Sequence, residues 1–318
     1  MKIPQKQYRN VVFHINKCID GLYRRCNNNC IFCSENVDEC KSCGIFMSID
    51  MMARVLDFLR ERYGKVDNIF FAGGEPTLRS EFPIMIHMAK KVSDNIHMTS
   101  NGTFEDPEVM ARSLKQSGLT HASFSLHGHD VATHESSTRT PGSFLKLTRS
   151  LKCFLENGFR VSINCVVTKL NVESLPEIVQ LVATKFQNIE SLTFTSYHKN
   201  GEACDYDSEL SFSPFDFKCN ISKSIDLASE HGIKLCFRDF PFCVDNRIKG
   251  MNLEVKDIYV VLWEDVNNFF FCSESFPKIR SHLCNKCSES DCIGFSDSAT
   301  SYKTDKYQAW EMGGQKDI

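Results

Sequence analysis

Residues 68–99 read NIFFAGGEPTLRSEFPIMIHMAKKVSDNIHMT. The stretch begins with a short β-rich run at 68–71, and a second such run follows at 95–99. Between them, apolar residues recur at three- and four-residue spacing over 80–92, which is typical of a helix that packs by one face. A strand, a helix and a strand in this order predict two parallel strands joined by a right-handed crossover.

The same alternation runs through most of the chain. We expect strands at 10–16, 68–71, 95–99, 122–126, 160–167 and 191–195. We expect helices between them at 48–63, 80–92, 106–117, 141–157 and 172–186. Eight such units close into a full barrel in about 250 residues, but the alternation fades after roughly residue 200. The sequence therefore predicts an α/β protein built on a partial, six-stranded parallel β/α barrel.

The character of the sequence changes after the polar stretch 197–216, which we interpret as a candidate boundary. One more helix is expected directly after it. Two β-rich runs at 257–263 and 269–272 then flank a polar turn, which indicates a β-hairpin. We predict a barrel core over residues 1–231 and a small cysteine-rich domain of hairpin and helix over residues 232–318.

Cysteine is the unusual residue in the composition. The chain has 16 cysteines among 318 residues, with 42% hydrophobic and 24% charged residues and a net charge of −3. This balance of charge does not indicate a nucleic-acid-binding protein. The sequence contains no run of about 18 apolar residues, so we expect no membrane-spanning helix. The polar start at 1–7 lacks the apolar centre of a secretory signal, so we expect a cytoplasmic protein. In that reducing compartment, clustered cysteines indicate metal or redox ligands.

Three cysteines crowd into the stretch CNNNCIFC at 26–33, on the loop after the first expected strand. Sites in parallel α/β folds gather at this carboxyl end of the strands. A closed zinc site takes four ligands, whereas a cube of four irons held by three thiolates keeps one iron open for another ligand. We predict that Cys26, Cys30 and Cys33 bind a 4Fe–4S cluster, and the alternative is three buried thiols that only pack.

Three motifs in this order resemble those of the radical S-adenosylmethionine (SAM) superfamily. They are the cysteine spacing of 26–33 with an aromatic residue before the last cysteine, FAGGEPT at 71–77 and TSNG at 99–102. The resemblance covers about residues 11–196 and implies that the open iron chelates the amino and carboxylate groups of SAM. It also implies that further residues contact SAM, and the two glycines among them would let the backbone approach the ligand closely. The residues expected to contact SAM are Phe32, Gly73, Gly74, Glu75, Asn101, Ser125 and Asn164.

Other side chains are candidates for contact with the substrate or the cofactor. His127 follows the fourth expected strand and is a candidate catalytic residue, with a merely solvated histidine as the alternative. Relatives often place an arginine near here, and Arg139 stands one position from the expected spacing. Cys236 and Cys272 are candidate catalytic thiols, substitute cluster ligands or packing residues. A further Cys-x2-Cys pair has no assigned role, namely Cys40 and Cys43.

A second group of cysteines lies toward the C-terminus. Its members are Cys243, Cys284, Cys287 and Cys292. Four thiolates can close either a 4Fe–4S cube or a zinc site. The arrangement resembles the Twitch or SPASM auxiliary-cluster domains that follow many radical SAM cores. It differs from a two-cluster SPASM pattern because no further cysteine follows Cys292. The resemblance therefore implies one auxiliary 4Fe–4S cluster, with a structural zinc ion as the alternative.

The resemblance implies an oxidoreductase- or lyase-type enzyme. It would take an electron from an external donor such as flavodoxin or ferredoxin, cleave SAM to a 5′-deoxyadenosyl radical, and abstract a hydrogen atom from its substrate, with the auxiliary cluster assisting electron transfer. Because the first strand begins near residue 10, leaving little room for a separate peptide-binding domain, we expect a small molecule. A sugar, an aminocyclitol or a nucleoside fits this expectation. The alternatives are a peptide-modifying maturase and a non-catalytic zinc-binding module that mediates protein contacts.

Overall fold

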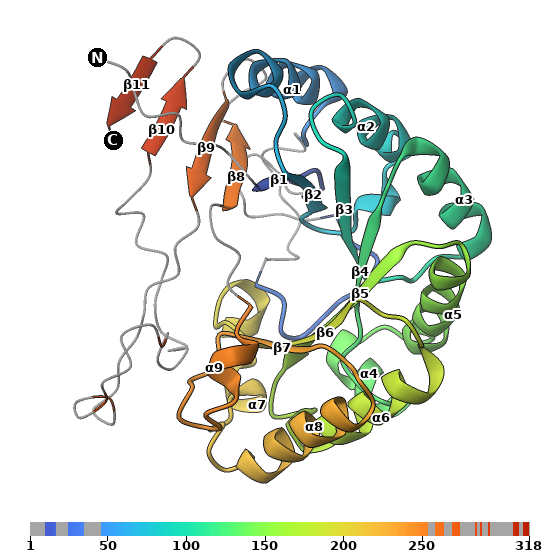
Figure 1. Ribbon diagram of the computed structural model, residues 1–318, viewed down its shortest axis with the longest axis vertical. Coiled ribbons are helices and arrows are strands. Elements are labelled where there is room, and N and C mark those ends of the chain that lie inside the picture. The colour runs from blue at the N-terminus through green and yellow to red at the C-terminus, as the bar shows by residue number, and fades with distance from the viewer. Residues whose placement is uncertain are drawn as a thin grey trace.

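The computed structural model describes most of the chain (Figure 1). The described residues are 10–16, 25–34, 46–253, 258–263, 269–273, 284, 287, 292, 308–311 and 314–317. Cys40 and Cys43 lie outside these ranges, and Cys272 lies at a strand position where only its backbone is described.

Within these ranges the chain forms a nine-stranded sheet in the order β7-β6-β5-β4-β3-β2-β1-β8-β9. The strands are β1 (Asn10–His14), β2 (Asn68–Ala72), β3 (Asn95–Ser100), β4 (His121–Ser125), β5 (Arg160–Val167), β6 (Ser191–Ser196), β7 (Leu235–Arg238), β8 (Ile258–Trp263) and β9 (Phe269–Ser273). Neighbouring strands from β7 to β8 are all parallel, and β9 is antiparallel to β8. The predicted parallel α/β sheet is confirmed, and it contains β7 and β8 in addition to the six expected parallel strands.

Helices cover the outer face of the curved sheet (Figure 1). The helices of the described ranges are α1 (Ile49–Tyr63), α2 (Phe82–Ala89), α3 (Pro107–Ser117), α4 (Val131–Thr138), α5 (Ser143–Glu156), α6 (Leu175–Lys185), α7 (Asp207–Leu210), α8 (Lys218–Glu230) and α9 (Ile248–Met251). The side chain of Asp106 caps α3 by accepting from the N–H groups of Glu108 and Val109. Gly118 ends the same helix with a φ of 105°. The helices expected between the strands are all present, with boundaries that differ by a few residues.

The helix α4 and the strand β7 were not expected from the sequence. The buried residues of α4 are His134, Ser137 and Thr138, which are polar, so the helix has no apolar repeat to reveal it. The strand β7 has only four residues, too few for an alternating pattern to stand out. Both elements are recognisable only from the neighbours against which they pack.

The two faces of the sheet differ in chemistry. One row of neighbouring residues across four strands is apolar and buried against the helices, namely Phe124, Ile163, Leu192 and Leu235. The next row is Ser125, Asn164, Thr193 and Cys236. Successive side chains of a strand point to opposite faces, so this row lines the concave face. The core therefore lies between sheet and helices, and the concave face presents hydroxyl, amide and thiol groups.

The predicted hairpin is confirmed as β8 and β9, with Tyr259 opposite Ser273. It does not stand apart from the barrel, because β8 pairs in parallel with β1 through Val11 opposite Tyr259. Two further strands, β10 (Gln308–Glu311) and β11 (Gly314–Asp317), form a small antiparallel pair. Among the described residues, no helix has the length and apolar character needed to cross a bilayer.

Candidate functional site

The cysteine loop, residues 25–34, lies at the carboxyl end of the sheet because it follows β1. Backbone hydrogen bonds anchor its start, since Arg25 N donates to the carbonyl of Asn16 at 2.9 Å and Glu75 N donates to the carbonyl of Arg25 at 2.8 Å. Near its end, the carbonyl of Cys33 accepts from Ala203 N at 3.1 Å. The segments that follow β1, β2 and β6 therefore fix the loop in place.

Two glycines after β2 let the chain pass directly against the cysteine loop. Gly73 and Gly74 have φ angles of 77° and 64°, in the region that favours glycine. A Cβ on Gly74 would lie 2.9 Å from the carbonyl of Asn16 and would clash with that of Arg25, while a Cβ on Gly73 would lie 2.8 Å from the Cβ of His14. The atoms that exclude a side chain here belong to the protein itself. A contact of these glycines with SAM stays a prediction.

Glu75 is a buried carboxylate that joins the ends of β2 and β3. It is 1% exposed and accepts from Thr77 Oγ1 at 2.7 Å, from Ser100 Oγ at 2.9 Å and from Asn101 N at 2.8 Å. Burial raises the pKa of Glu75, because the loss of water disfavours the ionised form more than these donors favour it. Both carboxylate oxygens bind the protein's own donors, so Glu75 supports the loops of the site.

The C-terminal end of α4 binds the cysteine loop. Asn29 N donates to the carbonyl of Thr138 at 3.2 Å. Arg139, which ends α4 with a φ of 50°, donates from Nε to the carbonyl of Asn29 at 2.7 Å and from a terminal nitrogen to Glu202 at 2.8 Å. The resemblance predicts an arginine in the loop after the fourth strand, one position from Arg139, and in this chain Arg139 reaches the loop that carries the predicted cluster ligands.

His127 lies beside the cysteine loop and is neutral. Its ring is 4.5 Å from the ring of Phe32, edge to face, and it is 3% exposed. The N–H of Val166 donates to Nδ1 at 3.1 Å, which fixes the tautomer with the proton on Nε2. Burial and the neighbouring His134 lower the pKa of His127 well below its usual range. His127 is therefore a neutral N–H donor beside Phe32 of the cysteine loop, and its catalytic role stays a prediction.

Two of the predicted SAM contacts are neighbours on the concave face. Ser125 lies opposite Asn164 in the register of β4 and β5, and Thr195 Oγ1 donates to Asn164 Oδ1 at 2.7 Å. Cys236 belongs to the same row on β7, and burial raises the pKa of its thiol. The structure thus brings a protonated thiol and two cofactor candidates to one surface.

Sequence reasoning missed a histidine–carboxylate pair at the carboxyl ends of β6 and β7. His198 Nε2 lies 2.9 Å from Asp239 Oδ2. Asp239 has a φ of 61°, which is uncommon for a residue other than glycine and often marks a functional position. No sequence pattern pointed to the pair, because β7 itself was not expected. A histidine held by a carboxylate can accept or pass on a proton.

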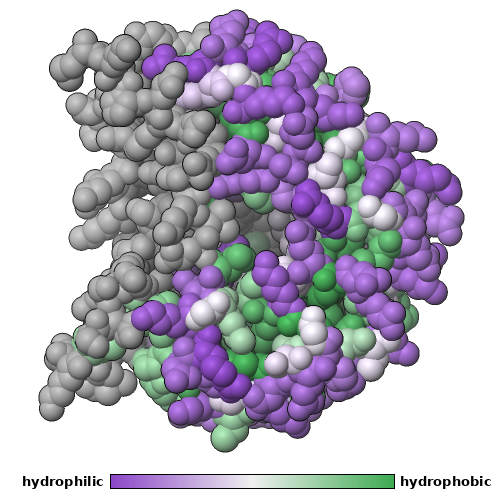
Figure 2. Space-filling view, viewed as in Figure 1, coloured by the Kyte–Doolittle hydropathy of each residue, from purple (hydrophilic) through white to green (hydrophobic). Residues whose placement is uncertain are grey.

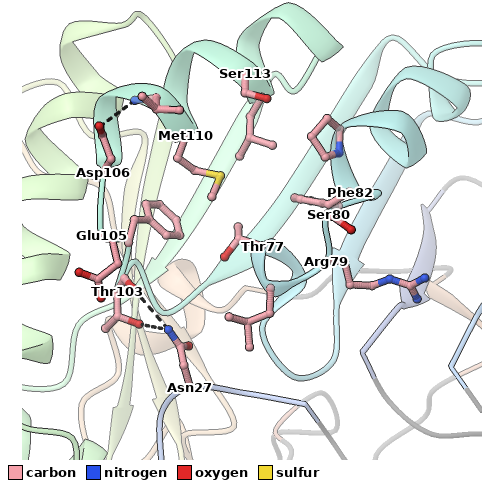
Figure 3. A pocket seen from close by; sticks show the side chains of 15 residues that line it. Asn27, Thr77, Arg79, Ser80, Phe82, Thr103, Glu105, Asp106, Met110 and Ser113 are labelled. Carbon is pink, nitrogen blue, oxygen red and sulfur yellow. Dashed lines mark hydrogen bonds between the residues drawn. The ribbon is translucent and has the colours of Figure 1, made fainter. Parts of the chain in front are cut away.

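A cavity of about 530 Å³ opens on the flank of the cysteine loop, between α2 and α3 (Figure 3). Asn27 of the loop and Thr103 form one wall, joined by a hydrogen bond of 2.8 Å from Asn27 Nδ2 to Thr103 Oγ1. Phe82 and Met110 line its apolar part. The three loop cysteines are not among its lining residues.

The C-terminal cysteines gather beside the segment after β7. Phe242 N donates to the sulfur of Cys292 at 3.5 Å, and Cys287 N donates to the carbonyl of Cys284 at 3.0 Å. Burial raises the pKa of the Cys243 thiol, and the other three thiols raise it further by their proximity. The structure therefore brings together four cysteines that are up to 49 positions apart, from 243 to 292.

Comparison with known proteins identifies the family. The family described as the Radical SAM superfamily matches residues 22–182, which is half of the chain. The chain belongs to the radical SAM superfamily. The match contains the cysteine loop, the Gly73–Gly74 turn and Asn101, so the predicted resemblance is confirmed.

Curated relatives of this radical SAM protein are named for different activities. The chain is 29% identical over 188 residues to the probable GTP 3′,8-cyclase of Thermoplasma volcanium, covering 58% of this chain and 56% of that protein. It is 28% identical over 244 residues to the Fe-coproporphyrin III synthase of Methanosarcina barkeri, covering 74% of this chain and 57% of that protein. The chain spans a little over half the length of these relatives.

A solved structure shows the same fold. SuiB of Streptococcus suis, bound to its precursor peptide SuiA, superposes with a TM-score of 0.60 at 14% sequence identity. The superposition covers 83% of this chain and 59% of that chain. At this identity the likeness establishes the fold alone.

Radical SAM proteins are enzymes that use a 4Fe–4S cluster and SAM, and the sulfur donors of the cysteine loop fit such a cluster. In the described part of the chain, no three histidine, cysteine or carboxylate side chains converge on one point, as the ligands of a single metal ion do. A four-iron cube instead binds each thiolate through a different iron. The N–H of Asn28 already donates to the sulfur of Cys26 at 3.4 Å, as N–H groups do around cluster thiolates.

Proposed function

We propose that this protein cleaves SAM at a 4Fe–4S cluster held by Cys26, Cys30 and Cys33. The observation that carries the proposal is the fixed position of the cysteine loop at the carboxyl end of the sheet, against the Gly73–Gly74 turn. When bound, the cluster supplies the electron that splits SAM into methionine and a 5′-deoxyadenosyl radical, which takes a hydrogen atom from the substrate.

The residues of the chain hold and orient the reactants. The loop cysteines bind three irons, while Arg139 and the end of α4 keep the loop from moving. Ser125 and Asn164 offer hydrogen bonds to the cofactor on the concave face. His198, paired with Asp239 just after β6 and β7, is a candidate proton acceptor. An external donor such as flavodoxin or ferredoxin supplies the electron.

We also propose one auxiliary 4Fe–4S cluster on Cys243, Cys284, Cys287 and Cys292. Four thiolates close such a cluster completely, which favours a role in electron transfer over binding of substrate to an open iron. The core of the enzyme then spans residues 1–231 and the auxiliary part residues 232–318. The strand β7 extends the core sheet from the beginning of the auxiliary part, so a continuous sheet joins the two sites.

The substrate we propose is a small hydroxyl-bearing molecule such as a sugar, an aminocyclitol or a nucleoside. The concave face carries hydroxyl and amide groups in successive rows, including Ser123, Ser125, Ser162, Asn164 and Thr193. Such groups recognise hydroxyl groups by reciprocal hydrogen bonds. The name of the Thermoplasma relative, a probable GTP cyclase, fits the same chemistry.

A peptide is the second candidate substrate. SuiB, which shares the fold, was solved with a bound precursor peptide. A peptide would need an extended path along the concave face, whereas a small molecule needs only one row of polar groups.

The cluster is tested by anaerobic purification followed by iron analysis and an assay for 5′-deoxyadenosine. We expect about four irons per cluster site and 5′-deoxyadenosine upon addition of SAM and dithionite. The triple variant Cys26→Ala, Cys30→Ala and Cys33→Ala should lose this product and about half of the iron. The control, Cys153→Ala with Cys219→Ala, changes cysteines on α5 and α8 and should retain both. A zinc-loaded protein without 5′-deoxyadenosine formation would establish the zinc-binding module instead.

The substrate class is tested by the rate of SAM cleavage. Substrate normally accelerates 5′-deoxyadenosine formation, because binding completes the active site. We expect nucleosides, sugars or aminocyclitols to accelerate it several-fold. Acceleration by peptides alone would establish the peptide-modifying alternative.

A further inference from the structure

We propose that the side-chain amide of Asn101 donates a hydrogen bond to the sulfur of Cys26 and thereby raises the reduction potential of the cluster held by the cysteine loop. This inference rests on the proposed function, because it needs a cluster on that loop. It assigns Asn101 the task of tuning the cluster, in addition to any contact with SAM. Asn101 is thus a positioning residue that acts through a cluster ligand.

The contact is direct. Asn101 Nδ2 lies 3.7 Å from Cys26 Sγ, within the range of a hydrogen bond to sulfur. The same sulfur accepts from the backbone N–H of Asn28 at 3.4 Å. Two amide donors therefore point at one cluster ligand, one from the loop itself and one from the segment after β3.

The hydrogen-bond network fixes which end of the Asn101 amide faces the sulfur. Oδ1 accepts from Thr103 N at 2.9 Å and from Thr103 Oγ1 at 2.6 Å. Nδ2 also donates to Asn27 Oδ1 at 2.7 Å. A flipped amide would turn its NH2 group toward two donors and its oxygen toward Asn27 Oδ1, so the network permits only one orientation.

The backbone of Asn101 is held as firmly as its side chain. Its N–H donates to Glu75 Oε2 at 2.8 Å, and Glu75 is buried beneath the turn after β2. On the far side, Thr103 Oγ1 accepts from Asn27 Nδ2 at 2.8 Å. The amide therefore stands between a buried carboxylate and the cysteine loop, and its distance to Cys26 is set before any cluster binds.

The effect on the potential follows from charge. A reduced cluster carries one more negative charge, which is spread over its sulfur atoms. A donor aimed at a sulfur therefore stabilises the reduced state more than the oxidised state, and the potential rises. An external donor then needs less driving force to deliver the electron.

The test is a redox titration followed by the electron paramagnetic resonance signal of the reduced cluster. The parent protein carries Cys284→Ser and Cys287→Ser, so that only the cysteine loop contributes to the signal. Asn101→Asp replaces the donor by an acceptor and should lower the equilibrium constant for reduction about tenfold, which is about 59 mV for one electron. Asn101→Ala removes the donor without adding charge and should shift the potential in the same direction by less.

The matched control uses another asparagine–cysteine pair. Asn157 Nδ2 lies 3.6 Å from Cys153 Sγ at the end of α5, outside the site. Asn157→Asp makes the same chemical change there and should leave the potential unchanged.

An unchanged potential in both Asn101 variants would overturn the inference and leave the proposed function intact. A shift in Asn101→Asp but not in Asn101→Ala would also overturn it, since charge alone would then be responsible. If the parent protein binds no iron at the cysteine loop, the proposed function itself fails, so the two failures are distinguishable.

Discussion

Burial keeps several histidines of the sheet and its loops neutral. Burial lowers the pKa of His97 to about 3, and it lowers the pKa values of His121 and His134 to about 4. His97 and His121 stack at 3.9 Å on the concave face near the amino ends of their strands. Charging either ring would place a cation in a site with little water, beside Arg160. Acid should therefore destabilise the fold through these side chains.

We predict that His134→Asn reduces the loss of stability in acid. The unfolded chain binds a proton near pH 6.5, whereas folded His134 binds one only near pH 4. The stability that depends on neutral His134 is therefore present above pH 6.5 and falls as the pH drops toward 4, by about 2 kcal/mol at pH 5. Asparagine retains an acceptor for the N–H of His127, which now donates to His134 at 3.1 Å, but it cannot take up a proton.

The measurement is urea denaturation at pH 7.5 and pH 5. The wild type should lose more free energy of unfolding between these values than His134→Asn. The exposed His231, changed in the same way, is the control and should behave as the wild type. Equal losses in all three proteins would contradict the prediction.

We predict that Arg139→Lys releases iron from the cysteine loop faster. The planar guanidinium of Arg139 donates hydrogen bonds to the carbonyl of Asn29 and to the carboxylate of Glu202 at the same time. A lysine ammonium is a single point charge and cannot bind both groups in this geometry. Iron transfer to a coloured chelator should accelerate several-fold. Arg60→Lys changes an arginine that pairs with Asp57 at 2.9 Å on α1, in contact with neither group of predicted ligands, and should leave the rate unchanged.

At the scale of elements, the turn after β2 and the cysteine loop depend on each other. Gly74→Ala tests this, because its Cβ would clash with the carbonyl of Arg25 at the start of the loop. We predict lower iron content after reconstitution and a lower melting temperature. Gly142→Ala is the matched control, since Gly142 has a similar φ of 79° but nothing within 4 Å of an added Cβ. If both variants lose iron equally, backbone strain and not the clash is responsible.

Elements with apolar repeats were predictable, and those without were not. Helices α1, α3 and α5 carry buried residues at helical spacing and lie close to the expected ranges. The helix α4 buries His134, Ser137 and Thr138 and has no such repeat. Yet α4 is the element whose end binds the cysteine loop. A polar helix of this kind is stabilised by its neighbours, so local sequence holds little sign of it.

At the scale of the molecule, the sheet is built from both ends of the chain (Figure 1). The strand β8 pairs with β1, and β1 leads into the cysteine loop. Figure 2 shows mostly polar residues over the outer helices, with apolar residues inward of them. The C-terminal hairpin therefore supports the strand that positions the first cluster ligands.

We predict that Val261→Asp destabilises the whole sheet. Val261 is fully buried opposite Phe13 of β1, and an unpaired carboxylate there costs roughly 3 kcal/mol or more. The free energy of unfolding and the iron content of the cysteine loop should fall together. Leu145→Asp, at a position that is 60% exposed, should change neither. Loss of C-terminal iron alone, with normal unfolding, would mean that the hairpin folds separately.

The candidate site was predictable where its residues are neighbours in sequence. The spacing of Cys26, Cys30 and Cys33 and the Gly73–Gly74 turn identified the family. The pairing of His198 with Asp239 joins residues 41 positions apart, and no local pattern indicated it. The bond from Asn101 to Cys26 spans 75 positions. Such contacts depend on which strands pair and in what register.

The sequence by itself determined the parallel α/β class and the cysteine groups, because strand and helix periods and ligand spacings are local properties of the chain. The tertiary structure decided that β8 lies beside β1, that α4 holds the cysteine loop and that Asn101 faces Cys26. Those choices are settled by burial and by hydrogen bonds between distant segments, which come together only when the whole sheet packs.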